Sequence, residues 1–532
     1  MFPYARIASA LEEISAAPRP ERTRIAAGIL SPLERQILCP VVRLLSGELW
    51  PTWEIREMGV GPQTIAFALE GITGEDVPGL LRELEEMGAV VEMALLHRSQ
   101  RSLSPQPLEA LFVYERLERI SLLKGPQSEH RKTSILRGLF QDASPLEGKY
   151  IARTALRSML AGLGPQTMIS AISSAWGCDP EAVRRAYQLL PELGLLAEAA
   201  RDGSLERIKI QPSRPVRPMI YLFGEAALPG AYLPWAPGLK VQVHRKGKEL
   251  YVFTARLHNI APALSDLKVD LARLDQDFIA DAQLLAIQEG TIQSTADVVR
   301  YINRRHRARR SWLLPALLAH DLIWLEGEDL AGMPFPERHK RLEQLLGEAK
   351  GLAIQGISAA ELKILQSQEE VEEYCRIVQN SGFLGLVAKD INAPYLPGGQ
   401  SSGDALVMRA GETVSAAIIQ AKAGQGRREG LAVKYRVALR KDDILVPVGW
   451  VSAGLGWREA EALGKSLQQL AIEQTPEGVS LRPRVILELH ISGLKRDGNG
   501  YNLVRPLIKG YSFDAATDEV DTLDKLEEIY KR

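Results

Sequence analysis

The first 205 residues carry apolar positions at helical spacing, interrupted by glycine and proline. The stretches "DVPGLLRELEEMGAVVEMALL" and "LEALFVYERLERISLL" place an apolar residue every three or four positions, and strand-like alternation is scarce. This pattern predicts an all-α domain over residues 1–205. The proline-rich stretch that follows, "LERIKIQPSRPVRPMIYLFG", keeps neither period and predicts an extended linker.

From about residue 216, short apolar runs rich in β-branched and aromatic residues replace the helical pattern. "KVQVHRKGKELYVFTAR" predicts two strands joined by a turn at Gly247, and further strands are indicated by "FIADAQLLAI", "DLIWLEG" and "LGLVAKD". The helical stretches "ERHKRLEQLLGEA" and "EEVEEYCRIVQNS" lie between the strands. We therefore expect an α+β domain over residues 206–409.

The last 120 or so residues alternate strand patterns with a single helical one. The strands are indicated by "TVSAAIIQAKAG", "GLAVKYRVALRKDDILVPVGWVSAG", "RPRVILELHI" and "YNLVRPLIKGYSF", and the helix by "REAEALGKSLQQLA". A run of short strands with one helix favours a small β-barrel, most simply an OB-type barrel, over residues 410–532.

Length and composition add few constraints. A chain of 532 residues is too long for one core, and 45% hydrophobic with 25% charged residues is typical of a globular protein. A net charge of −1 excludes the overall basicity of a surface dominated by phosphate contacts, but it allows a local basic channel. The cysteines, Cys39, Cys178 and Cys375, are too far apart for a metal knuckle and predict a reducing compartment.

No stretch of about 18 consecutive apolar residues occurs, which predicts no membrane partner. The opening "MFPYARIASALEEI" lacks the apolar core of a signal peptide. We therefore expect a cytoplasmic protein.

Several separated stretches occur in an order that identifies a family. "HRKTSILRGLFQDASPLE" precedes "GKYIARTALRSMLAGLGPQTMISAI"; "KVQVHRKGKELYVFTARL" precedes "HDLIWLEGEDLAGMPFPERHKRLEQLL" and "GFLGLVAKDINAPYLPGG"; "GQGRREGLAVKYRVALR" comes last. Together they resemble the replicative ATP-dependent DNA ligases of archaeal type, along essentially the whole chain. The resemblance implies an all-α DNA-binding domain, a nucleotidyltransferase (adenylation) domain and a C-terminal OB-fold β-barrel that together encircle nicked duplex DNA.

The adenylation motif of that family, Lys-x-Asp-Gly, is altered in this chain. Alignment through "GLKVQV" puts Gly238 on the glycine, Pro237 on the aspartate and Trp235 on the lysine. In the family that lysine's amine attacks the α-phosphate of ATP, and an indole cannot form the phosphoramidate. Trp235 either fills a hole in the core beside two prolines or offers a stacking surface for a base or a partner.

Other positions to which the resemblance assigns chemistry are altered in the same way. The family places at them a nucleotide-contacting arginine, two carboxylates that bind metal or ribose, and a phosphate-binding lysine; here they are Ala255, Gln283, Leu384 and Val407. A glutamine keeps the shape of glutamate but loses the charge that holds a hard divalent cation, so we expect no metal site. Gly238, Lys389 and the cation Arg409 are retained. His320 replaces an aromatic residue and is interpreted as a core histidine.

Lys240 is the alternative nucleophile. It stands about five residues from the usual position, roughly 16 Å along a strand, which is too far for in-line attack without a different architecture. We therefore expect a ligase homologue that has lost adenylation, needs no cofactor and acts in DNA replication or repair as a DNA- or protein-binding scaffold. The alternative is an active nucleotidyltransferase that uses Lys240, ATP and Mg²⁺.

Basic residues give candidates for contact with double-stranded or nicked DNA. The stretch "NRRHRARRSW" is either a solvated helix face or a phosphate-binding patch, because arginines bind phosphate without sequence preference. The candidates are Arg304, Arg305, Arg307, Arg309 and Arg310, with Arg427, Arg428 and Lys132 as further ones.

One stretch is similar to the peptide with which archaeal ligases dock on the sliding clamp. In "QRSLSPQPL", Gln100 and Leu103 supply the glutamine and the hydrophobic plug. Ser104 and Pro105 replace the aromatic residues that usually follow, which reduces the anchoring area. We therefore predict only a weak contact with the sliding clamp. We also expect a contact with another protein partner.

Overall fold

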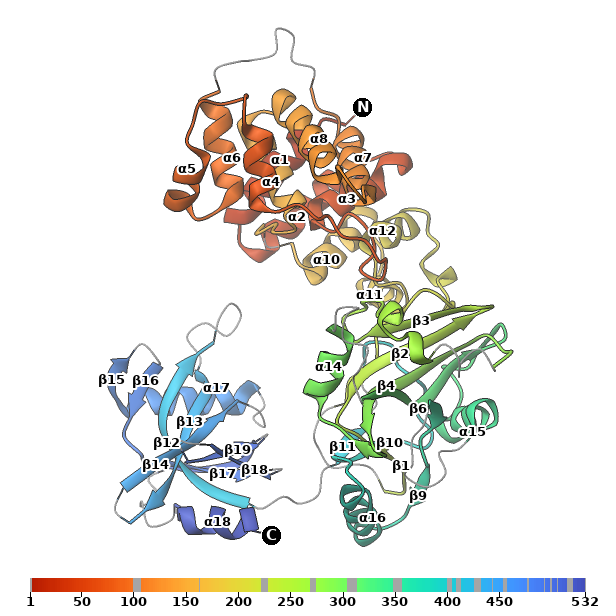
Figure 1. Ribbon diagram of the computed structural model, residues 1–532, viewed down its shortest axis with the longest axis vertical. Helices are drawn as coiled ribbons and strands as arrows, with labels where there is room; N and C mark the ends of the chain where they lie inside the picture. The colour runs from red at the N-terminus through yellow and green to blue at the C-terminus, as the bar shows by residue number, and fades with distance from the viewer. Residues whose placement is uncertain are drawn as a thin grey trace. The chain divides into compact units, whose positions relative to one another are not determined.

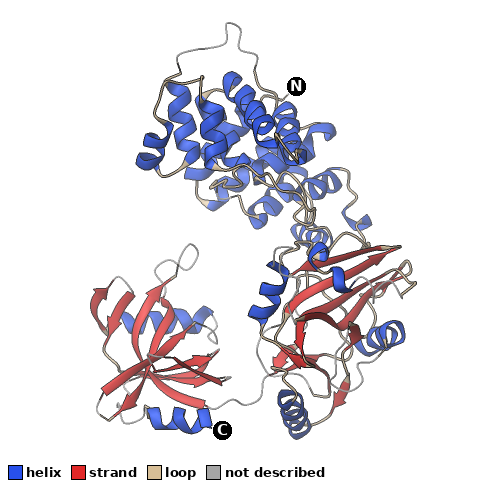
Figure 2. Cartoon of the chain, in the orientation of Figure 1, coloured by secondary structure: helices blue, strands red, loops and turns tan. Residues whose placement is uncertain are grey.

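The computed structural model describes most of the chain as two compact units (Figures 1 and 2). The described residues are 2–98, 107–161, 163–221, 228–267, 274–303, 313–347, 356–399, 404–407, 413–424, 432–442, 444–452, 457–475, 478–491, 493–497, 500–504, 506–513 and 520–531. The first unit comprises Met1–Ile220, Gly238–Ala360 and Asn392–Gln400, and the second comprises Tyr221–Pro237, Glu361–Ile391 and Ser401–Arg532. The domain limits at 205 and 409 stay predictions.

The predicted all-α region is confirmed in the first unit. Its helices are α1 (Tyr4–Ala16), α2 (Arg19–Leu30), α3 (Arg35–Ser46), α4 (Pro62–Leu69), α5 (Val77–Leu84), α6 (Met87–Leu96), α7 (Ala110–Leu122), α8 (Ser128–Asp142), α9 (Pro145–Ala155), α10 (Pro165–Trp176), α11 (Pro180–Leu189) and α12 (Leu193–Arg201). Their apolar faces form one continuous core.

Local sequence signals explain where these helices start. Pro145 occupies the first turn of α9, where its missing N–H costs nothing, and Ser144 and Glu147 form a reciprocal capping box. The Asp179 side chain accepts hydrogen bonds from the first backbone N–H groups of α11. Glycine in the left-handed region, Gly47 at φ 74°, ends α3.

The first unit also contains a β-sheet, here called the β2 sheet. Its strands are β2 (Leu239–Lys246), β3 (Glu249–Thr254), β4 (Phe278–Gln288), β5 (Thr291–Ile292), β6 (Leu314–Leu325), β7 (Glu328–Asp329) and β8 (Ile357–Ala359), in the order β3-β2-β4-β6-β7, with β5 on β4 and β8 on β6. The predicted turn between β2 and β3 is confirmed, with Gly247 at φ 58°. Helices α14 (Thr295–Asn303) and α15 (Phe335–Leu346) cover its apolar face.

The opposite face of the β2 sheet is polar and buried. Gln242 exchanges two hydrogen bonds with the backbone of Val216, at 3.1 and 2.9 Å, which fixes the orientation of its amide. Its Oε1 therefore also accepts from Nε2–H of His244, at 3.2 Å, and the edge of Phe253 packs on that imidazole. Because His244 is fully buried, desolvation lowers its pKa to about 3.

A buried ion pair ties α15 to the same sheet. Arg338 donates from Nε and Nη2 to the two carboxylate oxygens of Asp321 on β6, at 2.8 and 2.9 Å. Its Nη1 donates to the carbonyls of Met333 and Ala393, the latter at 3.2 Å. Both side chains are at most 1% exposed, so the pair is fully removed from water.

The second unit opens with a separate antiparallel sheet, here called the β1 sheet. Its strands are β1 (Gly230–Trp235), β9 (Lys363–Leu365), β10 (Gly385–Lys389) and β11 (Ala405–Val407), in the order β11-β10-β1-β9, with α16 (Gln368–Asn380) against β10. Strand β1 is absent from the sequence prediction because it contains Pro234. The structure accommodates this proline where β9, which pairs only with Gly230–Tyr232, no longer borders β1.

The remainder of the second unit is β-rich, as predicted. Its sheet has the order β14-β13-β12-β16-β15, with β17 bridging β12 and β20, and β18 pairs separately with β19. The elements are β12 (Thr413–Ala423), β13 (Ala432–Lys441), β14 (Ile444–Val451), α17 (Trp457–Gln468), β15 (Ala471–Thr475), β16 (Gly478–Leu481), β17 (Val485–His490), β18 (Gly493–Asp497), β19 (Gly500–Val504), β20 (Leu507–Phe513) and α18 (Leu523–Lys531). Among the described residues the strand pairings do not close into a ring, so a closed barrel is not observed.

Candidate functional site

The β1 sheet brings together three of the altered positions. Trp235 ends β1 opposite Gly385 of β10, and its carbonyl accepts a hydrogen bond from the N–H of Leu384 at 2.8 Å. Val407 ends β11 one register step away, opposite Leu386. The positions that the resemblance assigns to the nucleophile, a carboxylate and a phosphate-binding lysine are therefore neighbours in one sheet.

An aromatic and cationic cluster lies in the same part of the second unit. The Trp235 indole, which is partly buried, meets the Tyr221 ring edge-on, with ring centroids 5.9 Å apart. Nζ of Lys389 lies 5.4 Å from the centroid of the same Tyr221 ring, and Lys389 is only 2% exposed. Trp235 thus packs against another ring, a contact that both a space-filling residue and an aromatic stacking surface would make.

Gly238, the retained glycine of the motif, stands at a close approach between strands. A Cβ at Gly238 would lie 2.6 Å from the backbone oxygen of Leu284 on β4, a distance that real Cβ atoms do not reach. The residue is therefore required by the packing of β2 on β4, whatever chemistry takes place nearby. Pro237 directly precedes it in a bend between β1 and β2.

Lys240 is bound within the buried polar face of the β2 sheet. Its Nζ forms an ion pair with Asp281 at 3.0 Å and donates to the carbonyl oxygen of Met219 at 2.9 Å. Asp281 also accepts from the Tyr395 hydroxyl at 3.4 Å, and that hydroxyl accepts from the N–H of Met219 at 3.2 Å. These contacts hold the Lys240 ammonium within the sheet, between a carboxylate and a backbone carbonyl.

The remaining predicted positions of the β2 sheet lie on β3, β4 and β6. Gln283 is 1% exposed and stands directly opposite Lys240 on β2. Ala255 is exposed in the turn after β3. His320 is 3% exposed at the bulge in β6 where the pairing with β4 steps from Ala319 to Asp321, as expected for a core histidine.

The predicted nucleic-acid and partner contacts are mostly outside the described residues. Lys132 is the exception: its side chain is 8% exposed and its Nζ donates to the carbonyl oxygen of Gly59 at 2.9 Å. The ammonium of Lys132, a candidate for contact with DNA, is thus engaged by the backbone of the helical region. Outside the described residues lie Gln100, Leu103, Arg304, Arg305, Arg307, Arg309, Arg310, Arg409, Arg427 and Arg428.

Sequence reasoning missed a cationic face on the C-terminal sheet, defined by Lys422, Lys434, Arg436 and Trp450. Lys422 and Lys434 stand directly opposite each other on β12 and β13, and their ammonium groups lie 4.7 and 5.7 Å from the Trp450 ring centroid. Arg436 pairs with Trp450 across β13 and β14. Residues two positions apart in a strand lie on the same face, so the alternation in "AVKYRVALR" could have indicated that Lys434 and Arg436 share a face.

None of the helices in the described ranges combines the length and the apolar character needed to traverse a lipid bilayer.

Comparison with known proteins shows which family the chain is similar to. The model of the DNA ligase N terminus matches residues 3–173, and the model of the ATP dependent DNA ligase domain matches residues 236–405. The DNA ligase of Methanothermobacter thermautotrophicus is 28% identical over 542 residues, 97% of this chain and 96% of that protein. The DNA ligase of Archaeoglobus fulgidus is 28% identical over 550 residues, 99% of this chain and 98% of that protein.

Among solved structures, the ligase domain of M. tuberculosis LigD is 20% identical with a TM-score of 0.33, and covers 57% of this chain and 97% of its own. The two matching family models together span more than half of the sequence, and the relatives align with this chain over nearly its whole length. The chain therefore belongs to the ATP-dependent DNA ligase family.

Proposed function

We propose that this protein is a ligase-family member that does not adenylate itself and that binds DNA as a non-catalytic scaffold in replication or repair. The observation that carries the proposal is the residue at the end of β1. Trp235 stands there, aligned with the nucleophilic lysine of the family, and its indole nitrogen has no lone pair free to attack phosphorus.

The surroundings of Lys240 support the loss of adenylation. A relocated nucleophile would have to leave Asp281 and the Met219 carbonyl, to which it is bound at 3.0 and 2.9 Å. Leaving would strand the Asp281 carboxylate, whose side chain is 2% exposed, and breaking such a buried pair costs about 3–5 kcal/mol. Lys240 is therefore better explained as a structural cation.

The residues at the positions of the metal carboxylates do not fit Mg²⁺. Gln283 offers a neutral, 1% exposed amide, Leu384 offers no side-chain oxygen, and the nearby carboxylate of Asp281 is engaged by Lys240. A hard divalent cation prefers carboxylate and water oxygens. In the part of the chain that the structure describes, no three His, Cys, Asp or Glu side chains are grouped so as to hold a metal ion.

We expect no covalent label when the purified protein is incubated with α-labelled ATP and Mg²⁺. Without an amine at residue 235 the phosphoramidate cannot form. Denaturing gel electrophoresis would show the label, and intact-mass measurement would show whether the isolated protein already carries one AMP. The Methanothermobacter DNA ligase, treated in parallel, is the positive control.

The Lys240→Arg variant separates the two interpretations of Lys240. Arginine keeps the charge beside Asp281 but remains protonated and cannot act as the nucleophile. Label on the wild-type chain that disappears in Lys240→Arg would establish the relocated nucleophile and overturn the proposal. Label that persists in this variant would overturn it too, by pointing to another lysine.

The cationic face supports the DNA-binding part of the proposal. Lysines and an arginine around an indole are suited to phosphate and base contacts without sequence preference. We expect Lys422→Gln with Lys434→Gln to weaken binding to a nicked duplex and to lower the slope of log K against log salt by about 2. Fluorescence anisotropy over a salt series measures this slope.

Lys465→Gln is the matched control for that experiment. Lys465 lies in the same unit on α17, is 71% exposed and pairs with Glu461 instead of contacting Trp450. An unchanged slope in the double variant would remove the cationic face from DNA binding. If the wild-type chain did not bind nicked DNA at low salt, the protein would act as a scaffold for a protein partner only, and the DNA-binding part of the proposal would be wrong.

A further inference from the structure

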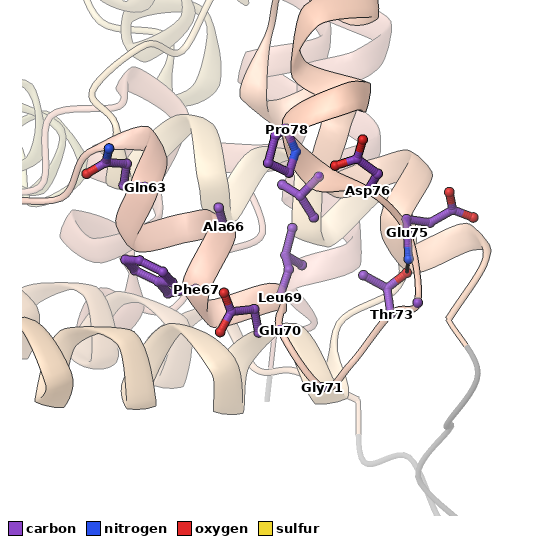
Figure 3. Close-up of a pocket in the computed structure, with 12 residues that line it drawn as sticks. Gln63, Ala66, Phe67, Leu69, Glu70, Gly71, Thr73, Glu75, Asp76 and Pro78 are labelled. Carbon is purple, nitrogen blue, oxygen red and sulfur yellow. Dashed lines mark hydrogen bonds between the residues drawn. The ribbon is translucent and has the colours of Figure 1, made fainter.

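The helical part of the first unit contains a pocket of about 550 Å³ between α4 and α5 (Figure 3). Its lining includes the apolar side chains of Phe67, Leu69, Val77 and Pro78. Phe67 is 53% exposed although its ring lines the pocket, so an apolar surface faces water there. The volume lies within the range of sites that bind a compact ligand or one or two side chains of a partner.

The charged residues that line this pocket are all acidic. They are Glu70, Glu75 and Asp76, and no Lys or Arg is among the lining residues. Glu75 pairs with His97 at 3.2 Å, and Asp76 lies 3.9 Å from Arg82 on the surface. Glu70 is exposed and follows Phe67 by three positions, and both are labelled in Figure 3 among the residues that line the pocket. An apolar wall with an adjacent negative charge is complementary to an apolar group next to a cation, and it repels phosphate.

Hydrogen bonds fix the backbone at the end of α4 and in the turn that follows it. Arg137 of α8 donates to the carbonyl oxygens of Phe67 and Ala68 at the end of α4, at 2.7 and 3.4 Å. Gly71 adopts φ 81° in the following turn, and the Thr73 hydroxyl accepts from the N–H of Glu75 at 3.2 Å. A preformed pocket loses little conformational entropy when it is filled, which favours binding.

From these observations we propose that the α4–α5 pocket docks a basic, apolar segment of a partner protein. The partner's Leu or Phe side chain fills the space between Phe67 and Val77, and a Lys or Arg beside it pairs with Glu70. This goes beyond the proposed scaffold function, because it requires neither the loss of adenylation nor DNA binding. The acidic rim assigns the surface to a protein rather than to nucleic acid.

The test uses the full chain and the dye-labelled peptide Gly-Ser-Lys-Leu-Phe-Lys-Gly-Ser, followed by fluorescence anisotropy. We expect this peptide to bind. The same peptide with Glu in place of both Lys residues should not bind. Phe67→Ala should weaken the affinity about tenfold, as for an anchor residue in a pocket. Glu70→Gln should weaken it about threefold to fivefold, as for an exposed ion pair, and high salt should reduce this difference.

Two matched variants separate the pocket from the general surface. Glu83→Gln removes an exposed carboxylate on α5 that does not line the pocket, and Leu122→Ala removes a 59% exposed side chain on α7. Both should leave the affinity unchanged, and thermal unfolding should show that all variants are folded. Equal binding of the Lys and Glu peptides, no binding of either, or equal losses in pocket and control variants overturns the proposal. Dimerisation of the free chain that Phe67→Ala abolishes, measured by sedimentation velocity, would assign the pocket to a second copy and overturn it as well.

Discussion

Replacing Arg338 by alanine is expected to destabilise the first unit by about 3–5 kcal/mol, the cost of breaking a fully buried ion pair. The substitution leaves Asp321, which is 0% exposed, with a charge deep under α15, and it also removes the donors to Met333 and Ala393. Urea unfolding followed by circular dichroism measures the change as a shift of the midpoint at unchanged slope.

The control for Arg338→Ala is Arg341→Ala on the same helix. Arg341 pairs with Glu328, but the two side chains are 33% and 57% exposed, so its loss should cost about 0–1 kcal/mol. The double variant Arg338→Met with Asp321→Leu should recover much of the stability, because it leaves no buried charge behind. If Arg338→Ala were as stable as Arg341→Ala, the Arg338–Asp321 pair would not be a main contributor to the stability of the first unit.

The stability of the first unit should fall on acidification because of His244. The folded pKa of His244 is about 3, against 6.5 for an exposed histidine, so between these values the unfolded chain binds a proton that the folded chain does not. Stability due to this group is fully present above pH 6.5 and is lost as the pH falls towards 3. The loss amounts to about 2 kcal/mol between pH 7 and pH 5.

Urea unfolding at a series of pH values, compared between the wild type and His244→Leu, isolates this contribution. The variant should lose less stability than the wild type over the same pH range, because leucine takes up no proton in either state. His130→Gln removes an exposed histidine of α8 and should leave the pH dependence as it is. Parallel pH curves for the wild type and His244→Leu would contradict the burial of a neutral imidazole.

The class of each region could be predicted because the residues that become buried in helices and in strands recur at characteristic spacings along the sequence. Helical spacing indicated helices in the first unit, including α5, α6 and α7, and short apolar runs indicated β2, β3 and β4. Strand β1 escaped because Pro234 argues against a strand, and only the pairing partners reveal that the proline sits where a neighbour is missing. Closure of the C-terminal strands depends on long-range pairing, which periodicity does not report.

The altered positions of the candidate site could be named from the resemblance, but their partners could not. Nothing near Lys240 in the sequence indicates Asp281, which lies 41 positions further on and binds it across β2 and β4. Lys132 shows the same limit: its ammonium binds the Gly59 carbonyl, which lies 73 positions upstream and which the local sequence does not indicate. The cationic face was missed for the same reason, since Trp450 lies against lysines from two other strands.

The close approach at Gly238 has a consequence for how the remnants of a motif are read. A side chain at this position would meet the Leu284 carbonyl, so the packing of β2 on β4 requires the glycine whether or not the chain reacts with ATP. A motif glycine that is kept for this steric reason therefore says nothing about the chemistry of the residues beside it.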